Sequence, residues 1–313
     1  ATTEIYPLSL HDALPICNLY GYVNIFRPEK PMQKFIDNRS RDINALAMSS
    51  PYPHVRFLTG TAQVAGHSQS LHALRHNVRK NLQHLQSHFV IIDLGAGSSF
   101  QNLDFFLLAD DQIVLSTCDS LSLYDAYGFI RAALFRKIQH NALTWPELFK
   151  KLMVCGDLTK GDHIRTVPAF LKEHEKEVPG VCRLIKDETL QFTPRLLLNN
   201  VHPNDDHGRA QNLGLITQSV LNVKTESWGE IRHDPQVREA AVKIRPDLLT
   251  GDCAALHDVE HLMAVYAPVR PVRPNGNNSS RFTPLCNHRC VAWDSCPVRS
   301  GGPPCAKHDN GRE

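Results

Sequence analysis

The stretch His88-Phe-Val-Ile-Ile-Asp-Leu-Gly-Ala-Gly97 decides the fold class of this chain. Four apolar residues follow one another without a polar interruption, and a carboxylate, Asp93, ends the run. A strand with one solvent-facing side alternates polar and apolar residues, whereas a strand of a parallel sheet is covered on both faces and is apolar throughout. The stretch therefore predicts a buried parallel strand that ends at Asp93.

Similar apolar runs recur along the chain and alternate with helical patterns. Further strands are predicted at 55–59, 112–116, 151–155 and 195–199. The spacing of apolar residues predicts helices between 60 and 82 and over about 121–136, 208–221 and 253–266. Strands that alternate with helices predict an α/β fold, a doubly wound and mostly parallel sheet.

The composition excludes several classes of protein. The chain has 313 residues, of which 42% are hydrophobic and 21% charged, so it is neither disordered nor collagen nor a coiled coil. Because no run of 18 apolar residues occurs, no transmembrane segment is expected. The 34 Lys and Arg against 32 Asp and Glu give a net charge of +2, which does not indicate nucleic acid or anionic lipid as a partner.

The first 16 residues are set aside from the predicted fold. Glu4, His11 and Asp12 interrupt what would be the apolar part of a secretory signal. The string from Leu8 to Ile16 looks like one reading frame of a sequencing adapter, so residues 1–16 are interpreted as a non-native scar. An unusual native N-terminal arm is the alternative. On the first interpretation, native sequence starts near Cys17 and the true N-terminus is missing.

Asp93 and Gly95 are the candidate catalytic residues. A carboxylate at the tip of a parallel strand can hold a metal-bound water, and the backbone amide of a following glycine can approach a terminal phosphate. These are two parts of a Mg-nucleotide site. An aspartate at this place can instead cap the next helix, and the spacing alone does not choose between the two roles.

The chain from Cys17 to about Tyr266 resembles the MinD/ParA family of P-loop ATPases, in particular its FleN/FlhG-like branch. The resemblance implies that Asp93 belongs to the Walker B motif, where it would hold a Mg-bound water, and Gly95 to switch II. In chain order, the matching stretches are Cys17–Tyr22 (the segment after switch I), Phe57–Gly60 (a strand ending in glycine), Phe89–Gly97 (Walker B and switch II), Asp104–Asp110 and Ser116–Tyr127 (the next strand and turn), and Trp228–Ala240 (a late signature).

Two of these stretches depart from the family. Cys118 and Asp119 stand where the turn usually has proline and glutamate, and Arg232 stands where the late signature has proline. The role of that turn in the family is therefore not transferred to Cys118 and Asp119.

Asn199 is the candidate adenine-binding residue. It ends the predicted strand 195–199, where the family places the asparagine that recognises the base. A carboxamide offers a donor and an acceptor, so it can pair with both the exocyclic amine and a ring nitrogen of adenine. A turn residue at the strand end is the alternative, and Asn200 is the alternative position.

The phosphate-binding loop of a P-loop ATPase is absent from this sequence. No G-x-x-x-x-G-K-[ST] occurs, and the nearest stretch, Gly60 to Ser68, has His67 where the lysine would be and is interpreted as a strand-to-helix turn. In the family, the P-loop lies upstream of the position matched by Asn18. We therefore expect a sheet that lacks its first strand, P-loop and first helix, in a chain that is inactive by itself.

The chain is divided into four segments. A non-native scar (1–16) precedes an incomplete MinD/ParA-like NTPase domain (17–267). A linker rich in Pro and Asn (268–281) then leads to a Cys-rich tail (282–313). The last helix carries Asp258, Glu260 and His261, so no amphipathic membrane anchor is predicted there. His174, within the charged run Lys172–Lys176, is expected on a solvated helix face.

Four cysteines of the tail are the candidate metal ligands: Cys286, Cys290, Cys296 and Cys305. Thiolates in a short, turn-rich segment that cannot build its own core suggest a metal in place of that core. Four thiolates suit zinc, and an iron–sulfur cluster is second because the spacing matches no standard ferredoxin run. A disordered tail with reduced thiols is the alternative. The remaining five cysteines are expected to be packed in the fold.

The resemblance implies a function for the intact parent protein. The parent would be a cytoplasmic Mg-dependent ATPase that acts as a nucleotide-dependent homodimer and positions or counts a cellular structure such as the flagellum. A non-hydrolysing regulatory or binding protein with a metal-binding tail is the alternative. A redox or metal sensor whose tail is the active part ranks third. The sequence does not identify a protein partner.

Overall fold

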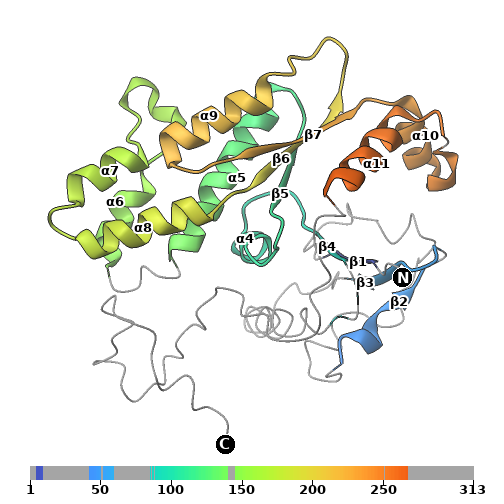
Figure 1. The fold of residues 1–313 in the computed structure, drawn as a ribbon, viewed down its shortest axis with the longest axis horizontal. Coiled ribbons are helices and arrows are strands. Elements are labelled where there is room, and N and C mark those ends of the chain that lie inside the picture. The colour runs from blue at the N-terminus through green and yellow to red at the C-terminus, as the bar shows by residue number, and fades with distance from the viewer. Residues whose placement is uncertain are drawn as a thin grey trace, which may run out of the picture.

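A computed structural model shows an α/β protein with two sheets of mainly parallel strands (Figure 1). It describes residues 5–9, 42–50, 52–59, 85, 87, 89–139, 145–249 and 251–266. The strands are β1 (Ile5–Ser9), β2 (Met48–Ser49), β3 (Arg56–Thr59), β4 (Phe89–Asp93), β5 (Ile113–Ser116), β6 (Arg195–Val201) and β7 (Glu226–Arg232). The α-helices are α4 (Phe100–Phe106), α5 (Ser120–Gln139), α6 (Pro146–Met153), α7 (Val167–His174), α8 (Pro179–Gln191), α9 (Arg209–Leu221), α10 (Pro235–Lys243) and α11 (Ala254–Tyr266). Short 3-10 helices are η1 (Asn44–Leu46), η3 (Leu158–His163) and η4 (Pro246–Leu248).

The two sheets divide the chain between β4 and β5. The first has the order β2-β3-β1-β4, in which β1 is parallel to both neighbours and β2 is antiparallel to β3. The second has the order β5-β6-β7 and is parallel throughout. The predicted α/β class with a parallel sheet is confirmed. Among the described strands, β4 and β5 each form the end of their sheet, so the predicted single sheet is interrupted there.

Strand β1 comes from the N-terminal segment that the sequence analysis set aside. Ile5–Ser9 pairs with β4 along its whole length and with β3 at Leu8 and Ser9. These five residues therefore take part in the first sheet, and the interpretation of residues 1–16 as a scar stays a prediction. The physical reason is pairing, because without β1 the facing backbone edges of β3 and β4 would carry unsatisfied amides and carbonyls.

The main core lies between the second sheet and the helices that cover it. Helix α5 buries Ile130, Leu134 and Ile138 at helical spacing against β6, where Leu196 and Leu198 are fully buried. Helices α7, α8 and α9 add their apolar faces to the same core, and Figure 1 shows α6, α7 and α8 gathered at one end and α10 and α11 at the other. This core fixes the carboxyl ends of β5 and β6.

Helix α4 connects the main core with a smaller core beneath the first sheet. Leu103 and Phe106 belong to the main core, whereas Phe105 packs in the smaller core with Leu58 of β3. Leu94, just after β4, is packed against both. The two sheets are therefore held by one helix that follows β4 and precedes β5.

Two predicted strands are helical. The run 151–155 lies in α6 and the turn after it, and the stretch 104–110 matched to a family strand lies in α4 and its C-terminal turn. Four or five apolar residues in a row fit a buried strand or a buried helix turn equally well. The residues upstream of 151–155 favour a helix there, because Pro146 occupies the first turn of α6 and Phe149 and Leu152 share its buried face.

His174 was expected in solvent and is buried. It ends α7 with 5% of its surface exposed, its Nδ1 lies 3.0 Å from the carbonyl oxygen of Phe170, and its ring stacks on the Phe170 ring. The flanking charges Lys172 and Glu173 are exposed, so the charged run describes only one side of this helix.

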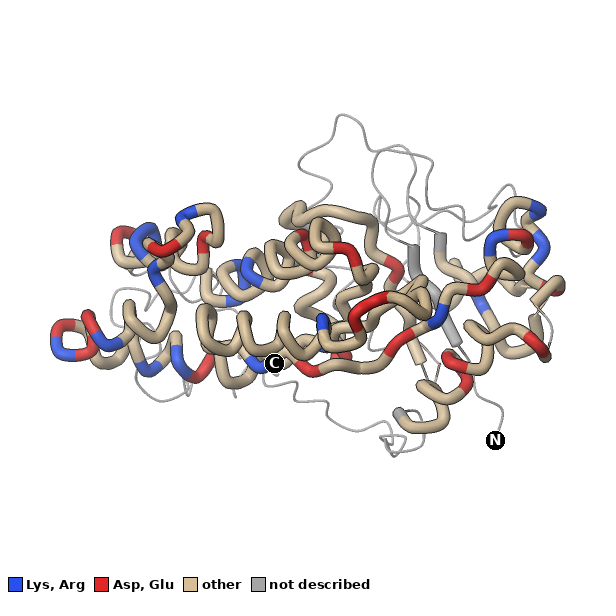
Figure 2. Tube along the Cα trace, turned by 90° about the horizontal axis from the view of Figure 1, so that it is seen from above, with Lys and Arg blue, Asp and Glu red and all other residues tan. Residues whose placement is uncertain are grey.

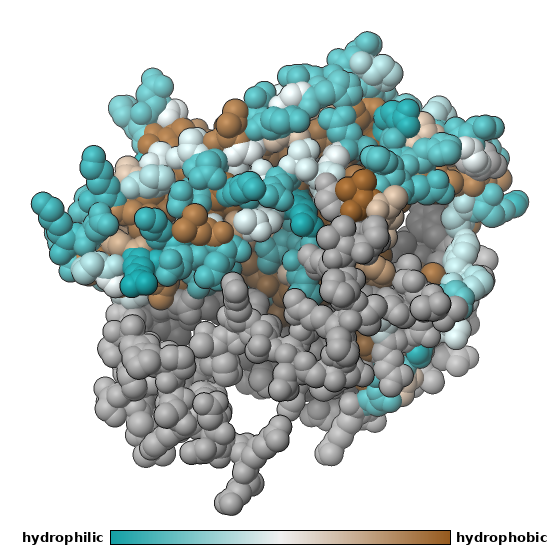
Figure 3. Space-filling model, viewed as in Figure 1, coloured by the Kyte–Doolittle hydropathy of each residue, from teal (hydrophilic) through white to brown (hydrophobic). Residues whose placement is uncertain are grey.

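The described surface shows no face of a single charge. Figure 2 shows basic and acidic residues interspersed along the trace, in agreement with the low net charge, and Figure 3 shows hydrophobic residues scattered among hydrophilic ones. Over the described residues, none of the helices has the length and apolarity needed to cross a bilayer.

Candidate functional site

Asp93 and Gly95 lie together in the connection between β4 and α4. Asp93 is the last residue of β4 and is half-buried, and Gly95 follows in the loop. The cap of α4 is Ser99, whose side chain accepts a hydrogen bond from the Asn102 amide at 3.2 Å. Since α4 begins at Phe100, Asp93 is not the N-cap of the next helix, and the capping role considered for it does not hold.

The glycine loop is held in shape by Asn102, which the sequence analysis did not single out. Asn102 Nδ2 donates to the carbonyl oxygens of Gly95 at 2.9 Å and Gly97 at 3.1 Å. Gly97 has a φ of 97°, a conformation that favours glycine. The loop is therefore tied to the first turn of α4. The spacing Ser99-x-x-Asn102 is the signal that could have found it.

Asn199 lies where β6 loses its regular register with β7. Leu198 pairs with Glu230 and Val201 with Arg232, so an irregularity falls on the two asparagines between them. Asn200 has a φ of 59° and its Oδ1 lies 2.8 Å from Nδ1 of His233. Within the described residues, no such side-chain hydrogen bond involves Asn199. Bulges of this kind re-aim side chains near functional sites.

Two stacked histidines adjoin this bulge. His202, just after β6, and His233, just after β7, have ring centroids 4.2 Å apart and nearly parallel planes. The backbone amide of His233 also donates to the carbonyl oxygen of Val201 at 2.8 Å. The stack fixes the loops beside Asn199, and sequence reasoning missed it because the two histidines are 31 positions apart.

The turn after β5 has a structural role that explains its departure from the family. Asp119 caps α5, accepting from the Ser122 amide at 2.8 Å and the Ser122 hydroxyl at 2.6 Å. Thr117 donates to the same carboxylate. These hydrogen bonds, that of the Ser122 hydroxyl first, hold the pKa of Asp119 well below its usual range. Arg209 at the start of α9 donates to the Cys118 carbonyl, which joins this turn to the start of α9.

Local structure also explains why Arg232 can stand where the late signature has proline. Arg232, in place of proline, donates through Nη2 to Asp258 Oδ1 at 2.7 Å, and its backbone amide donates to Asp258 Oδ2 at 2.9 Å. Asp234 caps α10 and accepts from the Ala254 amide at 2.7 Å. These contacts, with the ion pair to Arg232 first, keep the pKa of Asp258 below its usual value. The signature therefore ties the end of β7 to α11.

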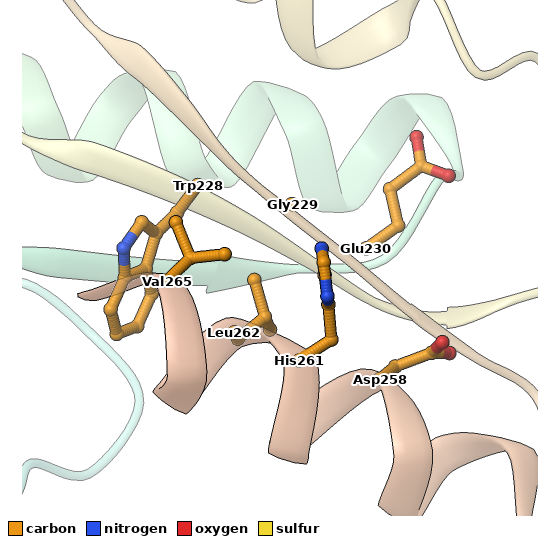
Figure 4. Close-up of a pocket in the computed structure, with 7 residues that line it drawn as sticks. All are labelled: Trp228, Gly229, Glu230, Asp258, His261, Leu262 and Val265. Atoms are coloured by element: carbon orange, nitrogen blue, oxygen red, sulfur yellow. The ribbon is translucent and has the colours of Figure 1, made fainter. Parts of the chain in front are cut away.

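A pocket of about 190 Å³ lies between β7 and α11 (Figure 4). It is smaller than the cavities of about 300–1,000 Å³ that usually hold small-molecule ligands. Figure 4 shows Trp228 and Val265 at one end and Glu230 and Asp258 toward the other. None of Asp93, Gly95 and Asn199 lines it. The candidate nucleotide residues therefore occupy two strand ends, Asp93 with Gly95 in one sheet and Asn199 in the other.

The candidate metal ligands Cys286, Cys290, Cys296 and Cys305 lie outside the described residues, as do the linker and the stretch from Gly60 to Ser68. In the part of the chain that the structure describes, no group of three His, Cys, Asp or Glu side chains is placed to hold a metal ion. Four of the other five cysteines are described, and all are buried free thiols, as expected: Cys118, Cys155, Cys182 and Cys253. Burial raises the pKa of Cys155 to about 11.

No protein-family model and no curated protein matches this chain. Among solved structures, it is similar to the cell division ATPase MinD of Pyrococcus furiosus at 12% identity and a TM-score of 0.48, over 84% of this chain and 86% of that one. It is also similar to the MinC:MinD cell division protein complex of Aquifex aeolicus at 11% identity and a TM-score of 0.49, over 88% of each chain. A ParA family ATPase from Chlorobium tepidum is similar at 11% identity and a TM-score of 0.47, over 85% of this chain and 86% of that one. These neighbours are MinD/ParA family ATPases.

Proposed function

We propose that this chain is a part of a MinD/ParA-type ATPase of the FleN/FlhG-like branch, whose parent positions or counts a cellular structure. One observation carries the proposal. Strand β4 ends in a half-buried aspartate that does not cap the following helix, and the next residues form a glycine loop whose carbonyls are held by Asn102.

Asp93, Gly95 and Asn199 are each of the chemical kind that a Mg-nucleotide site uses. Asp93 would hold a metal-bound water, the amide of Gly95 would face the terminal phosphate, and Asn199 would pair with adenine. Mg²⁺ bound to the phosphates would neutralise charge that develops as the phosphoryl group is transferred. The parent would act as a nucleotide-dependent homodimer in the cytoplasm, and the tail cysteines would bind zinc or, second, an iron–sulfur cluster.

The break between β4 and β5 supports the further proposal that a strand, a lysine loop and a helix belong to the parent and not to this chain. The sequence contains no G-x-x-x-x-G-K-[ST], so the chain has no lysine to neutralise the phosphates. We therefore propose that the chain alone does not hydrolyse ATP. This leaves the non-hydrolysing binding protein as the second candidate, which the missing lysine loop favours if the gene begins as written.

The first experiment is Asp93→Ala in the restored parent. Hydrolysis should fall at least about 100-fold because the Mg-bound water loses its carboxylate. Far-UV circular dichroism and the urea midpoint of unfolding check that the variant folds. Asp110→Ala removes an exposed carboxylate that follows α4 and serves as the matched control, with activity retained. Wild-type turnover in the Asp93→Ala protein would remove Asp93 from the mechanism.

A further inference from the structure

The pocket between β7 and α11 begins at an irregularity of β7. Consecutive residues of β6 pair with Ser227 and Gly229, so Trp228 is an extra residue between the two pairs. A bulge of this kind re-aims a side chain and bends its strand. Figure 4 shows the Trp228 indole beside Val265 of α11, at one end of the pocket. The bulge therefore supplies an aromatic wall that a regular strand would not place there.

Helix α11 approaches β7 closely at Gly229. A Cβ atom on Gly229 would lie 2.6 Å from Leu262 Cδ2, and the φ of 141° at this position favours glycine. Leu262 is 8% exposed and lines the pocket together with Trp228 and Val265. The pocket therefore has an apolar end, formed by one aromatic and two aliphatic side chains.

The other end of the pocket is acidic. Glu230 and Asp258 line it, and their side chains are only 27% and 18% exposed. Both oxygens of Asp258 accept hydrogen bonds from Arg232, so this charge has a cationic partner. Glu230 accepts through Oε2 from Nδ1 of His207 at 2.6 Å. Above the pKa of His207 the imidazole is neutral, and it then makes this hydrogen bond without cancelling the charge of Glu230.

The charged groups around this end leave a surplus of negative charge. Asp205 and Asp206 act electrostatically on His207, Asp234 acts on Arg232, and Arg209 lies 4.0 Å from Asp206. The carboxylates of this group are Asp205, Asp206, Glu230, Asp234 and Asp258, against Arg209 and Arg232. Complementary charge selects a partner, so the acidic end favours a cation.

We propose that this pocket binds one lysine side chain of a partner protein. The stem would lie along Trp228, Leu262 and Val265, and the ammonium would donate to Glu230. Lysine joins a flexible four-carbon stem to a compact cation, so it matches both ends of the pocket. The volume of about 190 Å³ suits a single side chain better than a whole small-molecule ligand.

Two other kinds of side chain fit the pocket less well. Arginine binds best when both oxygens of one carboxylate face its planar guanidinium. Glu230 already accepts from His207 through one oxygen, and both oxygens of Asp258 are taken by Arg232. An apolar side chain would fill the end at Trp228 but would leave the carboxylate of Glu230 without a cation.

The test is saturation-transfer NMR of the end-blocked peptide Gly-Ser-Lys-Ser-Gly with the full chain. It is done without nucleotide, at a chain concentration where light scattering reports a monomer. At about pH 9 the histidines are neutral and the lysine is still charged. The lysine methylenes should receive the strongest saturation. A peptide with norleucine in place of lysine keeps the stem without the ammonium and should bind about tenfold more weakly, because it loses a charge-assisted hydrogen bond.

Substitutions of two carboxylates supply the matched comparison. Glu230→Gln keeps an oxygen that can accept from His207 but removes the charge. It should weaken the lysine peptide by about tenfold and leave the norleucine peptide unchanged. Glu260→Gln removes a carboxylate of α11 that is 65% exposed and does not line the pocket, so it should not change either affinity. Far-UV circular dichroism checks that both variants fold.

Four results would overturn the proposal: no saturable binding of the lysine peptide, equal affinity for the norleucine peptide, equal weakening by the two substitutions, or tighter binding of n-butylammonium than of the peptide. The last result would assign the pocket to a free amine instead of a partner protein. None of Asp93, Gly95 and Asn199 lines the pocket, so lysine binding and ATP hydrolysis by the restored parent succeed or fail independently.

Discussion

At the scale of single residues, the roles of the two candidate aspartates separate clearly. Asp119 caps α5 and is held by Ser122 and Thr117, whereas Asp93 sits before a helix that Ser99 already caps. A capping aspartate stabilises the helix that follows it, whereas Asp93 does not serve α4 in this way. We therefore expect the two positions to respond to substitution in opposite ways, Asp119 in stability and Asp93 in activity.

Asp119→Ala should lower the urea midpoint of unfolding at neutral pH. The pKa of Asp119 is lowered in the folded state, so its contribution is complete above the ordinary carboxyl pKa and is lost as the pH falls through the folded-state value. The difference from the unchanged chain should therefore shrink toward acid pH. Asp125→Ala, at an exposed position of the same helix, is the control. A difference that is constant with pH would show that charge at Asp119 does not stabilise α5.

At the scale of elements, helix α4 connects the two cores and so the two sheets. Its contacts reach both cores, and it is fixed to α5 by a two-pronged ion pair, with Arg136 Nε 2.6 Å from Asp104 Oδ1 and Arg136 Nη2 2.9 Å from Asp104 Oδ2. The guanidinium also lies 4.7 Å from the centre of the Phe100 ring. The glycine loop depends on this docking because Asn102 holds it from the same helix.

Asp104→Ala should lower the free energy of unfolding by about 1.5–3 kcal/mol, because Arg136 would keep its buried position and lose two charge-assisted hydrogen bonds. Both side chains are only 17% exposed, so solvent screens the pair weakly. Glu239→Ala breaks an exposed pair with Lys243 on α10 and should cost about 0.5 kcal/mol or less. If urea unfolding shows that the two variants lose equal free energy of unfolding, the Asp104–Arg136 pair does not hold α4 on α5 more strongly than an exposed ion pair would.

At the scale of the whole molecule, the interruption of the sheet governs behaviour in solution. Among the described strands, β4 and β5 each have an unpaired edge, and Ile91 and Leu115 on these strands are more than half exposed. Such surfaces recruit other chains without a closed symmetry, so association continues with concentration instead of stopping at a dimer. The strand of the proposed missing segment would pair with these edges and so prevent open-ended association. Its lysine loop would complete the nucleotide site.

The purified chain should therefore self-associate in an open-ended, concentration-dependent way and should bind Mg-ATP weakly or not at all. Light scattering over a dilution series and calorimetry with Mg-ATP measure the two effects. A monodisperse monomer that binds Mg-ATP tightly would contradict the proposal of a missing lysine loop. Long-read sequencing across the junction upstream of the Cys17 codon distinguishes the causes, because an in-frame strand, lysine loop and helix there would establish a truncated ATPase.

Much of the fold could be read from local sequence. The apolar runs before Asp93, Ser116 and Asn199 became β4, β5 and β6, and the helical spacings became α5, α9 and α11. Local pattern failed at 151–155, where a short apolar run belongs to a helix, and at His174, whose exposed neighbours hid a buried ring. Both failures arise because burial depends on which face meets the core, and a short window does not contain that information.

The sequence by itself determined the α/β class, the strand that ends at Asp93 and the absence of a lysine loop, because continuous apolar runs and a motif are properties of neighbouring residues. Only the tertiary structure decided that Ser99 and not Asp93 caps α4, that Asn102 holds the glycine loop and that β1 fills the place between β3 and β4. It also decided that β4 and β5, among the described strands, belong to two separate sheets. Those features are pairings between groups that lie apart in the chain, and they form only when the backbone satisfies its hydrogen bonds across the sheet and the two cores close around α4.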